Sequence, residues 1–123
     1  MKLFDFAIII ALSSAFTVTS GAEFYFKEPR VKFADTKAGE IITHTWHFTN
    51  SGTDALIISG YNVACSCTQI IYPEQPIAPG ESGTVQLSFD TKGKYGLQMR
   101  KIEILSNAGK GSYFLSFKVY ILE

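Results

Sequence analysis

The sequence lacks the features by which several functional classes are recognised. Eleven basic residues balance eleven acidic ones, so the formal net charge is +0. Without a basic excess the chain has little means of displacing counterions from a phosphate backbone, and we expect no nucleic-acid partner. It also has no Gly-rich phosphate loop, no nucleophile elbow and no carboxylate pair suited to glycoside chemistry. We therefore expect no enzymatic activity and no cofactor.

Cysteine is scarce, with only Cys65 and Cys67 among 123 residues. Two cysteines are too few for a disulfide framework, so a packed core must supply most of the stability. The material for a core is present, because 46% of the residues are hydrophobic and 14% are aromatic. A chain of this length is expected to form one domain.

Long hydrophobic runs are missing except near the N-terminus. Lys2 precedes an apolar run over residues 6–16, and Ser20 and Ala22 place small residues at the −3 and −1 positions before Glu23. These features are typical of a secretory signal peptide, and the run is shorter than the roughly 20 residues that span a bilayer. We predict a signal peptide over residues 1–22 and a mature domain over 23–123 without a transmembrane segment. The protein would be exported to the periplasm or cell surface, an oxidising environment.

The rest of the chain alternates between hydrophobic and polar residues in short runs separated by turn residues. Val85, Leu87 and Phe89 give the clearest run, and no segment has sustained helical spacing. This pattern predicts an all-β, immunoglobulin-like antiparallel sandwich of about seven strands. The expected strands are 24–33 with a break at Pro29, 41–49, 55–63, 70–72, 84–89, 97–105 and 113–122.

Two strands carry more detailed expectations. Leu97 and Met99 are in one phase and Ile102 and Ile104 in the other, which predicts a β-bulge near Arg100. In the segment 41–49, Ile42, His44, Trp46 and Phe48 share one face. We expect Trp46 to lie in the core between the sheets.

Four segments in order resemble the signature of a family of bacterial exported domains of unknown function. They are Trp46-His47-Phe48-Thr49-Asn50-Ser51-Gly52, Cys65-Ser66-Cys67-Thr68, Pro76-Ile77-Ala78-Pro79-Gly80-Glu81-Ser82-Gly83 and Phe89-Asp90-Thr91-Lys92-Gly93. The family pattern reads Asn-Thr-Gly, Cys-Gly-Cys-Thr, Pro-Ile-Ala-Pro-Gly-Glu and Phe-Asp-Ser/Thr-Lys-Gly. The family is similar in fold to major sperm protein and Hydin-type domains. The resemblance implies an immunoglobulin-like sandwich and no established activity.

One position departs from that pattern, because Ser66 stands where the family has glycine. A backbone that required positive φ at this point would strain Ser66.

Cys65 and Cys67 are the residues in the sequence with a candidate chemistry. Two residues of a strand lie about 6.6 Å apart, at the far edge of disulfide geometry, and a bend at Ser66 would bring the pair into range. So small a ring would contribute only roughly 1.5 kcal/mol, and the bond would be reduced more readily than an ordinary structural disulfide. We rank a local disulfide first, a soft-metal site second and redox catalysis third. Zinc would need two further ligands.

His44 and His47 do not complete such a site. Three residues apart on one strand, they point to opposite faces. We expect His44 to be hydrogen-bonded and partly buried, and His47 to face solvent.

Two functional hypotheses remain. The first is a non-enzymatic binding or structural module whose partner is a protein or a cell-envelope component. It would work through exposed strand edges and loops, and a long unprotected edge strand near surface aromatics would support it. Candidate surface aromatics are Tyr72, Tyr95, Phe114 and Tyr120. The alternative is a redox or soft-metal-handling protein, which requires exposed sulfurs at Cys65 and Cys67 with partners nearby.

Overall fold

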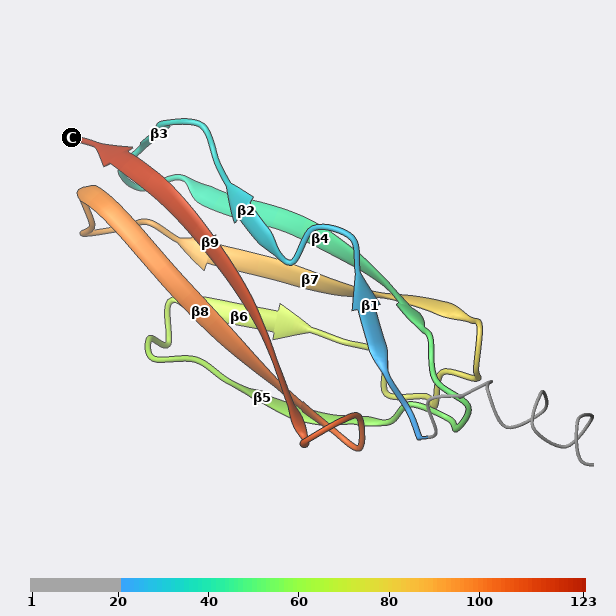
Figure 1. Ribbon diagram of the computed structural model, residues 1–123. Coiled ribbons are helices and arrows are strands. Elements are labelled where there is room, and N and C mark those ends of the chain that lie inside the picture. The colour runs from blue at the N-terminus through green and yellow to red at the C-terminus, as the bar shows by residue number, and fades with distance from the viewer. Residues whose placement is uncertain (1–20) are drawn as a thin grey trace, which may run out of the picture.

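The computed structural model describes residues 21–123, and they form a sandwich of two β-sheets in which the long strands β8 and β9 cross over the other sheet (Figure 1). The predicted signal peptide lies outside the described residues apart from Gly21 and Ala22, and it stays a prediction. The strands are β1 (Phe24–Phe26), β2 (Arg30–Lys32), β3 (Thr36–Lys37), β4 (Ile41–Asn50), β5 (Ile58–Asn62), β6 (Thr68–Ile71), β7 (Ser82–Asp90), β8 (Gly96–Ser106) and β9 (Ser112–Leu122).

The strand order confirms the predicted all-β, immunoglobulin-like sandwich. One sheet has the order β1-β4-β7-β6, and the other has the order β2-β9-β8-β5 with β3 also paired to β9. Nine strands form where about seven were expected. Most pairs are antiparallel, but β2 and β3 run parallel to β9.

The additional strands arise at the beginning of the domain. The segment expected to be one broken edge strand divides at Pro29, so that β1 pairs with β4 and β2 pairs with β9 in the opposite sheet. Proline has no N–H to donate to a ladder, and the Pro29 carbonyl instead accepts a hydrogen bond from the Ser116 N–H at 3.1 Å. The chain changes sheets here without reversing direction, and this makes β2 parallel to β9.

The core consists of the inward rows of both sheets, as the period-two pattern predicted. Trp46 is 2% exposed, and Val85, Leu87 and Phe89 are all buried. The facing sheet contributes Ile102, Ile104, Leu115, Phe117, Val119 and Ile121. Phe89 and Phe117 meet edge to face across the sandwich, with ring centroids 5.0 Å apart.

The predicted bulge near Arg100 is wrong. The pairing of β8 with β9 runs without a break from Gly96 opposite Ile121 to Leu105 opposite Ser112. Leu97 and Met99 therefore face outward, and Gln98 and Arg100 face inward.

The inward Arg100 is accommodated only in part, because its Nε is buried without a hydrogen-bond partner among the described residues. Its guanidinium lies over the Phe89 ring, 5.6 Å from the centroid, and its Nη2 donates a hydrogen bond to Gln98 Oε1 at 2.6 Å. A long side chain of this kind packs its stem against apolar groups while its head finds polar contacts. The hydrophobic residues of β8 thus face outward before Arg100 and inward after it, although the pairing with β9 is unbroken.

Candidate functional site

The family-like residue Asn50 stabilises the fold. It is fully buried, and its Oδ1 accepts hydrogen bonds from the backbone N–H groups of Glu23 (3.2 Å) and Gly52 (3.0 Å). Its Nδ2 donates to the carbonyl oxygens of Asp54 (2.8 Å) and Ile77 (2.9 Å). One amide therefore joins the entry to β1, its own turn and the loop that precedes β7.

Gly52 completes that turn because a side chain there has no room. An added Cβ would collide with the carbonyl oxygen of Gly21. The backbone of Gly21 accepts a hydrogen bond from the Thr53 N–H at 2.8 Å and donates one to Thr53 Oγ1 at 3.1 Å. Ala22 beside it is 5% exposed. The Asn-Ser-Gly motif thus anchors the start of the described chain.

Thr91, in the last of the family-like motifs, is also structural. It is completely buried, its Oγ1 donates to the carbonyl of Glu40, and the same oxygen accepts the Gly39 N–H at 2.9 Å. These contacts hold the turn before β4 against the end of β7. Like Asn50, Thr91 is occupied with backbone groups and is not available to a ligand.

The structure places the sulfur atoms of Cys65 and Cys67 at disulfide-bonding distance. The two Cα atoms are 5.1 Å apart, closer than in a straight strand, because the chain turns here and the Thr68 N–H donates to the Cys65 carbonyl at 3.1 Å. No non-glycine residue in 21–123 has positive φ, so Ser66 carries no strain of that kind. Both cysteines are half-buried.

The histidines lie on opposite sides of β4. His47 is exposed, whereas His44 packs edge-on between the rings of Phe33 (5.4 Å) and Trp46 (5.0 Å). Burial lowers the pKa of His44 below its ordinary value of 6.5; Glu28 opposes this shift and His47 adds to it. No group of three or more His, Cys, Asp or Glu side chains converges within the described part of the chain. Cys65 and Cys67 thus have no further metal ligands among those residues.

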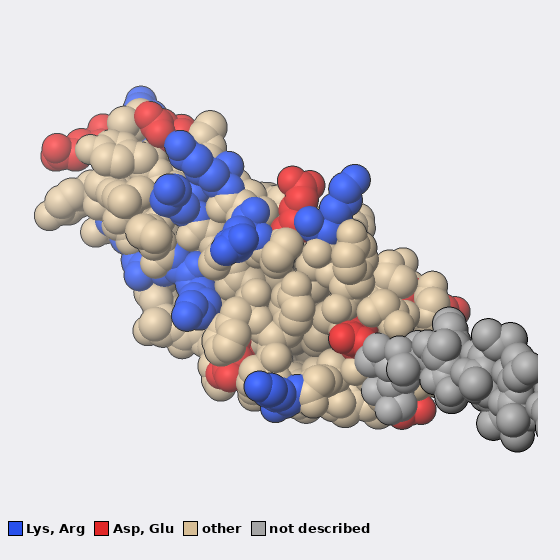
Figure 2. Space-filling model, in the orientation of Figure 1, with Lys and Arg blue, Asp and Glu red and all other residues tan. Residues whose placement is uncertain are grey.

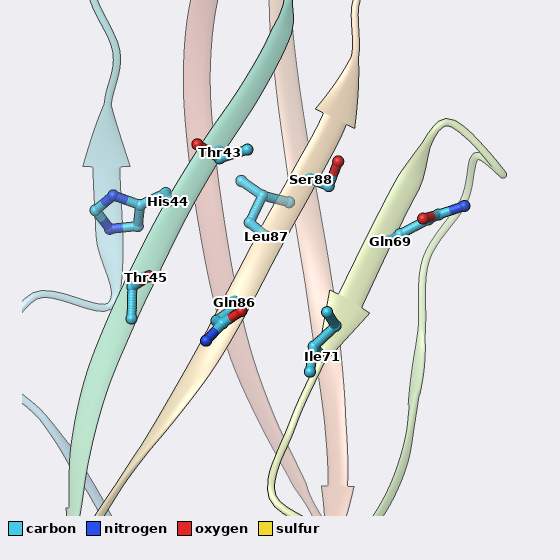
Figure 3. A pocket seen from close by; sticks show the side chains of 8 residues that line it. All are labelled: Thr43, His44, Thr45, Gln69, Ile71, Gln86, Leu87 and Ser88. Atoms are coloured by element: carbon cyan, nitrogen blue, oxygen red, sulfur yellow. The ribbon is translucent and has the colours of Figure 1, made fainter.

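The outer face of the four-stranded sheet has a shallow hollow of about 490 Å³. Figure 3 shows the side chains of β4, β7 and β6 that border it, which include Thr43, Thr45, Gln86 and Ser88. These groups are polar and uncharged. His44 also borders the hollow but belongs to the inward row of β4, and the outward His47 does not border it.

The opposite outer surface has a different character. We call it the β8–β9 face: the outward side chains of residues 97–101 and 114–122, together with those of β2. Its apolar members are Leu97 (57% exposed), Met99 (67%), Phe114 (51%), Tyr120 (50%) and Leu122 (41%). These are five of the ten large hydrophobic side chains that are exposed among the described residues, and apolar groups gathered on one face mark interaction sites.

Four cations share this face. Arg30 of β2 and Lys101 of β8 stand opposite Ser116 of β9 on its two sides, and Lys32 stands opposite Lys118 in the next row. The small Ser116 leaves a hollow of about 530 Å³ that all four cationic side chains border. Figure 2 shows the resulting concentration of Lys and Arg over β2, β8 and β9.

Sequence reasoning identified part of this surface. Phe114, Tyr120 and Tyr95 are exposed as expected for surface aromatics, whereas Tyr72 is half-buried and meets the Tyr61 ring edge-on at 6.3 Å. The cationic cluster was missed, because it forms only when β2 pairs with β9 more than 80 positions later. The sequence offered one signal for this cluster: Arg30 and Lys32 are two positions apart and therefore lie on the same side of one strand.

The edges of the sheets are short. The terminal strands β1, β2, β5 and β6 have three, three, five and four residues, and the pairing of β5 is irregular near Gly60. Such edges are poor templates for an added strand. These short strands leave longer edges unpaired, however: β1 pairs only with residues 48–50 of β4 and β5 only with residues 103–106 of β8, so within residues 21–123 no second strand pairs with 41–47 or with 96–102.

Comparison with known proteins identifies a family of unknown activity. The family described as "Protein of unknown function (DUF1573)" matches residues 24–121. No curated protein matches the chain. No helix of residues 21–123 is long and apolar enough to cross a membrane.

Solved structures show the same fold at low identity. A protein of unknown function from Porphyromonas gingivalis W83 is 15% identical with a TM-score of 0.69, over 87% of this chain and 50% of that one. The secreted serine protease VesC from Vibrio cholerae is 19% identical with a TM-score of 0.62, over 84% and 23%. A PapD-like domain of human CEP192 is 12% identical with a TM-score of 0.65, over 88% and 91%. The chain thus spans half or less of the two bacterial proteins, and these likenesses concern the fold alone.

Proposed function

The chain belongs to the DUF1573 family of proteins of unknown function, and from this premise we propose that it is a non-enzymatic binding or structural module that works through its β8–β9 face. The observation that carries the proposal is the reversed half of β8, where Leu97 and Met99 point to solvent while Gln98 and Arg100 point inward. A strand whose only requirement was to fold would place its apolar residues inside. Exposed apolar rows of this kind mark interaction surfaces.

The other candidate residues and surfaces also support this assignment, because they are engaged within the protein or lack a suitable arrangement of groups. Asn50, Gly52 and Thr91 are engaged in backbone contacts, and the hollow on the opposite sheet is bordered by uncharged side chains and by His44 of the inward row. The unpaired edge of β8 over residues 96–102 borders the same face. The β8–β9 face is therefore the surface with both apolar area and charge left to offer a partner.

Photo-crosslinking in the producing cell tests this proposal. A photoreactive benzoylphenylalanine replaces Met99 in one variant and Gln86 in another; Gln86 is also exposed but lies on the outer face of the other sheet. After illumination we expect discrete adducts, of protein or lipid, from position 99 and not from position 86. No adduct at position 99, or the same adducts at both positions, would refute a role for this face.

The alternative is a redox or soft-metal-handling role for Cys65 and Cys67. The observation in its favour is that the bridge joins residues only two positions apart, so that it adds little to stability and gives the fold little reason to keep it. The test is titration in glutathione buffers, with the free thiols counted by alkylation and mass. Reversible opening at a potential above about −300 mV would support a redox role, and a lower potential would identify a structural link.

A further inference from the structure

We infer that the partner of the β8–β9 face is the surface of an anionic lipid bilayer, with phosphate-bearing headgroups seated over Ser116 among Arg30, Lys32, Lys101 and Lys118. This inference rests on the proposed function and names its partner. Two observations carry it: the arrangement of the four cations and the apolar side chains that continue the same surface.

The cations are placed where they repel one another. Lys32 and Lys118 are direct neighbours across the β2–β9 pair, and Arg30 and Lys101 flank Ser116 from both sides. Like charges opposite one another on adjacent strands destabilise a sheet, and an anion between them would remove that cost. The hollow above Ser116 has a volume of about 530 Å³, which is ample for a phosphoryl group and its ester substituents.

Nearby acids do not neutralise the cluster. The carboxylate of Glu103 accepts hydrogen bonds from Asn62 Nδ2 at 2.9 Å and Ser112 Oγ at 2.7 Å. Asp35 borders a separate hollow beside Lys32 and Lys118. Of the described residues, no carboxylate borders the hollow over Ser116. The surface keeps a local positive charge on a chain whose net charge is +0.

The apolar side chains lie beside the cations. Met99 is paired with Lys118, and the next row holds Leu97 paired with Tyr120, with Leu122 beyond it. Phe114 lies on the other side, under the Lys101 ammonium at 5.1 Å. The outward row of β9 from Phe114 to Leu122 extends about 27 Å. A surface of cations with adjacent aliphatic and aromatic groups matches the boundary between headgroups and acyl chains.

Other occupants fit less well. A second copy of the chain would bring four cations against four cations, which disfavours self-association. A protein partner would need a matching acidic surface, and three of the four cations are lysines, which are depleted at protein interfaces relative to arginine. Lysine binds phosphate as a compact point charge and does not need a planar partner.

Vesicle co-sedimentation of the purified protein tests the inference. One set of vesicles is phosphatidylcholine alone, and in the other about one third of the lipid is phosphatidylglycerol. We expect binding to the anionic vesicles only, and its loss when the salt concentration rises from about 0.1 M to about 1 M. The variant Lys101→Glu with Lys118→Glu should weaken partitioning by about 25-fold or more, since each lysine near an anionic surface contributes a factor of about five.

Two further variants control the result. Lys27→Glu with Lys110→Glu makes the same charge change at exposed lysines outside the face and should retain most of the binding. Leu97→Ser with Met99→Ser should weaken it while the cations remain. All variants share one N-terminus, so differences between them belong to the sheet face.

The outcomes separate this inference from the function on which it rests. Absent or equal binding to the two kinds of vesicle, or equal loss in the face and control variants, would overturn the lipid assignment. If position 99 nevertheless yields protein adducts in cells, the binding module stands with a protein partner. If position 99 yields no adduct of any kind, the proposed function fails with it.

Discussion

At the scale of single residues, Asn50 shows how one buried side chain can organise three segments. Its Oδ1 accepts two backbone N–H groups and its Nδ2 donates to two carbonyl oxygens. All the hydrogen-bonding capacity of the amide toward these groups is used, so its hydrogen bonds offset the cost of removing this polar group from water. The side chain must be an amide, because only an amide supplies both donors and acceptors in that shape.

The substitution Asn50→Asp tests this argument with almost no change in volume. A carboxylate would present an acceptor to the carbonyl oxygens of Asp54 and Ile77, and a charge would be buried among them. We expect the free energy of unfolding to fall by about 2–4 kcal/mol, measured by urea denaturation. Gln86→Glu, an amide-to-acid change at an exposed position, should change it by less than about 0.5 kcal/mol. Equal effects of the two variants would contradict the structural role of Asn50.

His44 gives the molecule a pH dependence of known sign. Its pKa in the folded protein is lowered by burial, so below the ordinary value of 6.5 the unfolded chain binds a proton at this position more readily than the folded one. The contribution of the neutral His44 to the free energy of unfolding is therefore fully present above about pH 6.5, and it decreases as the pH falls toward the pKa of the folded state.

The measurement is the free energy of unfolding between about pH 8 and about pH 5.5, a range in which histidine is the main side chain to titrate. The variant His44→Gln should show a flatter dependence than the natural protein. In the natural protein, Glu28 raises the pKa of His44 and His47 lowers it. Identical slopes in the two proteins would show that the burial of His44 does not control the dependence.

At the scale of elements, the loop with Cys65 and Cys67 connects the edge strands β5 and β6 of opposite sheets. Closing a ring across two positions restricts the unfolded chain very little. Replacing both cysteines by serine should therefore lower the free energy of unfolding by no more than roughly 1.5 kcal/mol, as measured by denaturation without reductant. A loss of several kcal/mol would show that the bridge is a main support of the fold.

Strands in which hydrophobic and polar residues alternate strictly could be predicted from the sequence. Features that depend on pairing with another strand could not. Trp46, Val85, Leu87 and Phe89 alternate with polar residues, and the structure buries all four as expected. In β8 the hydrophobic residues change faces at Arg100, and the same pattern fits a bulge or an exposed apolar row. Only the unbroken pairing with β9 decides between them.

At the scale of the whole molecule, the candidate site depends on a pairing that local patterns do not encode. The aromatic part of the β8–β9 face was predictable, because Phe114 and Tyr120 lie out of phase with the core residues of β9. The cationic part requires that the chain switch sheets at Pro29 and place Arg30 and Lys32 beside Ser116 and Lys118. A sequence pattern reports which side of a strand a residue occupies, but not which strand lies next to it.

The start of the folded domain offers a last prediction at this scale. Gly21 exchanges hydrogen bonds with Thr53, and its carbonyl also accepts the Asp54 N–H at 3.4 Å. Ala22 packs into the core with 5% of its surface exposed. A chain beginning at Glu23 would lack these contacts, so its free energy of unfolding should be about 1–3 kcal/mol lower than that of a chain beginning at Gly21.

Thermal and urea denaturation of the two purified chains would measure this difference, and equal stabilities would show that the contact at Gly52 is incidental. If the chain is exported as the sequence predicts, the mass of the mature protein would then show which form the cell produces. Cleavage of a leader before Gly21 would keep the contact with the Asn-Ser-Gly turn. Cleavage after Ala22 would remove that contact. Since Gly52 leaves room for the Gly21 carbonyl and for no side chain of its own, we expect that, if a leader is removed, the cut falls at or before Gly21 and not after Ala22, where the sequence pattern alone predicts it.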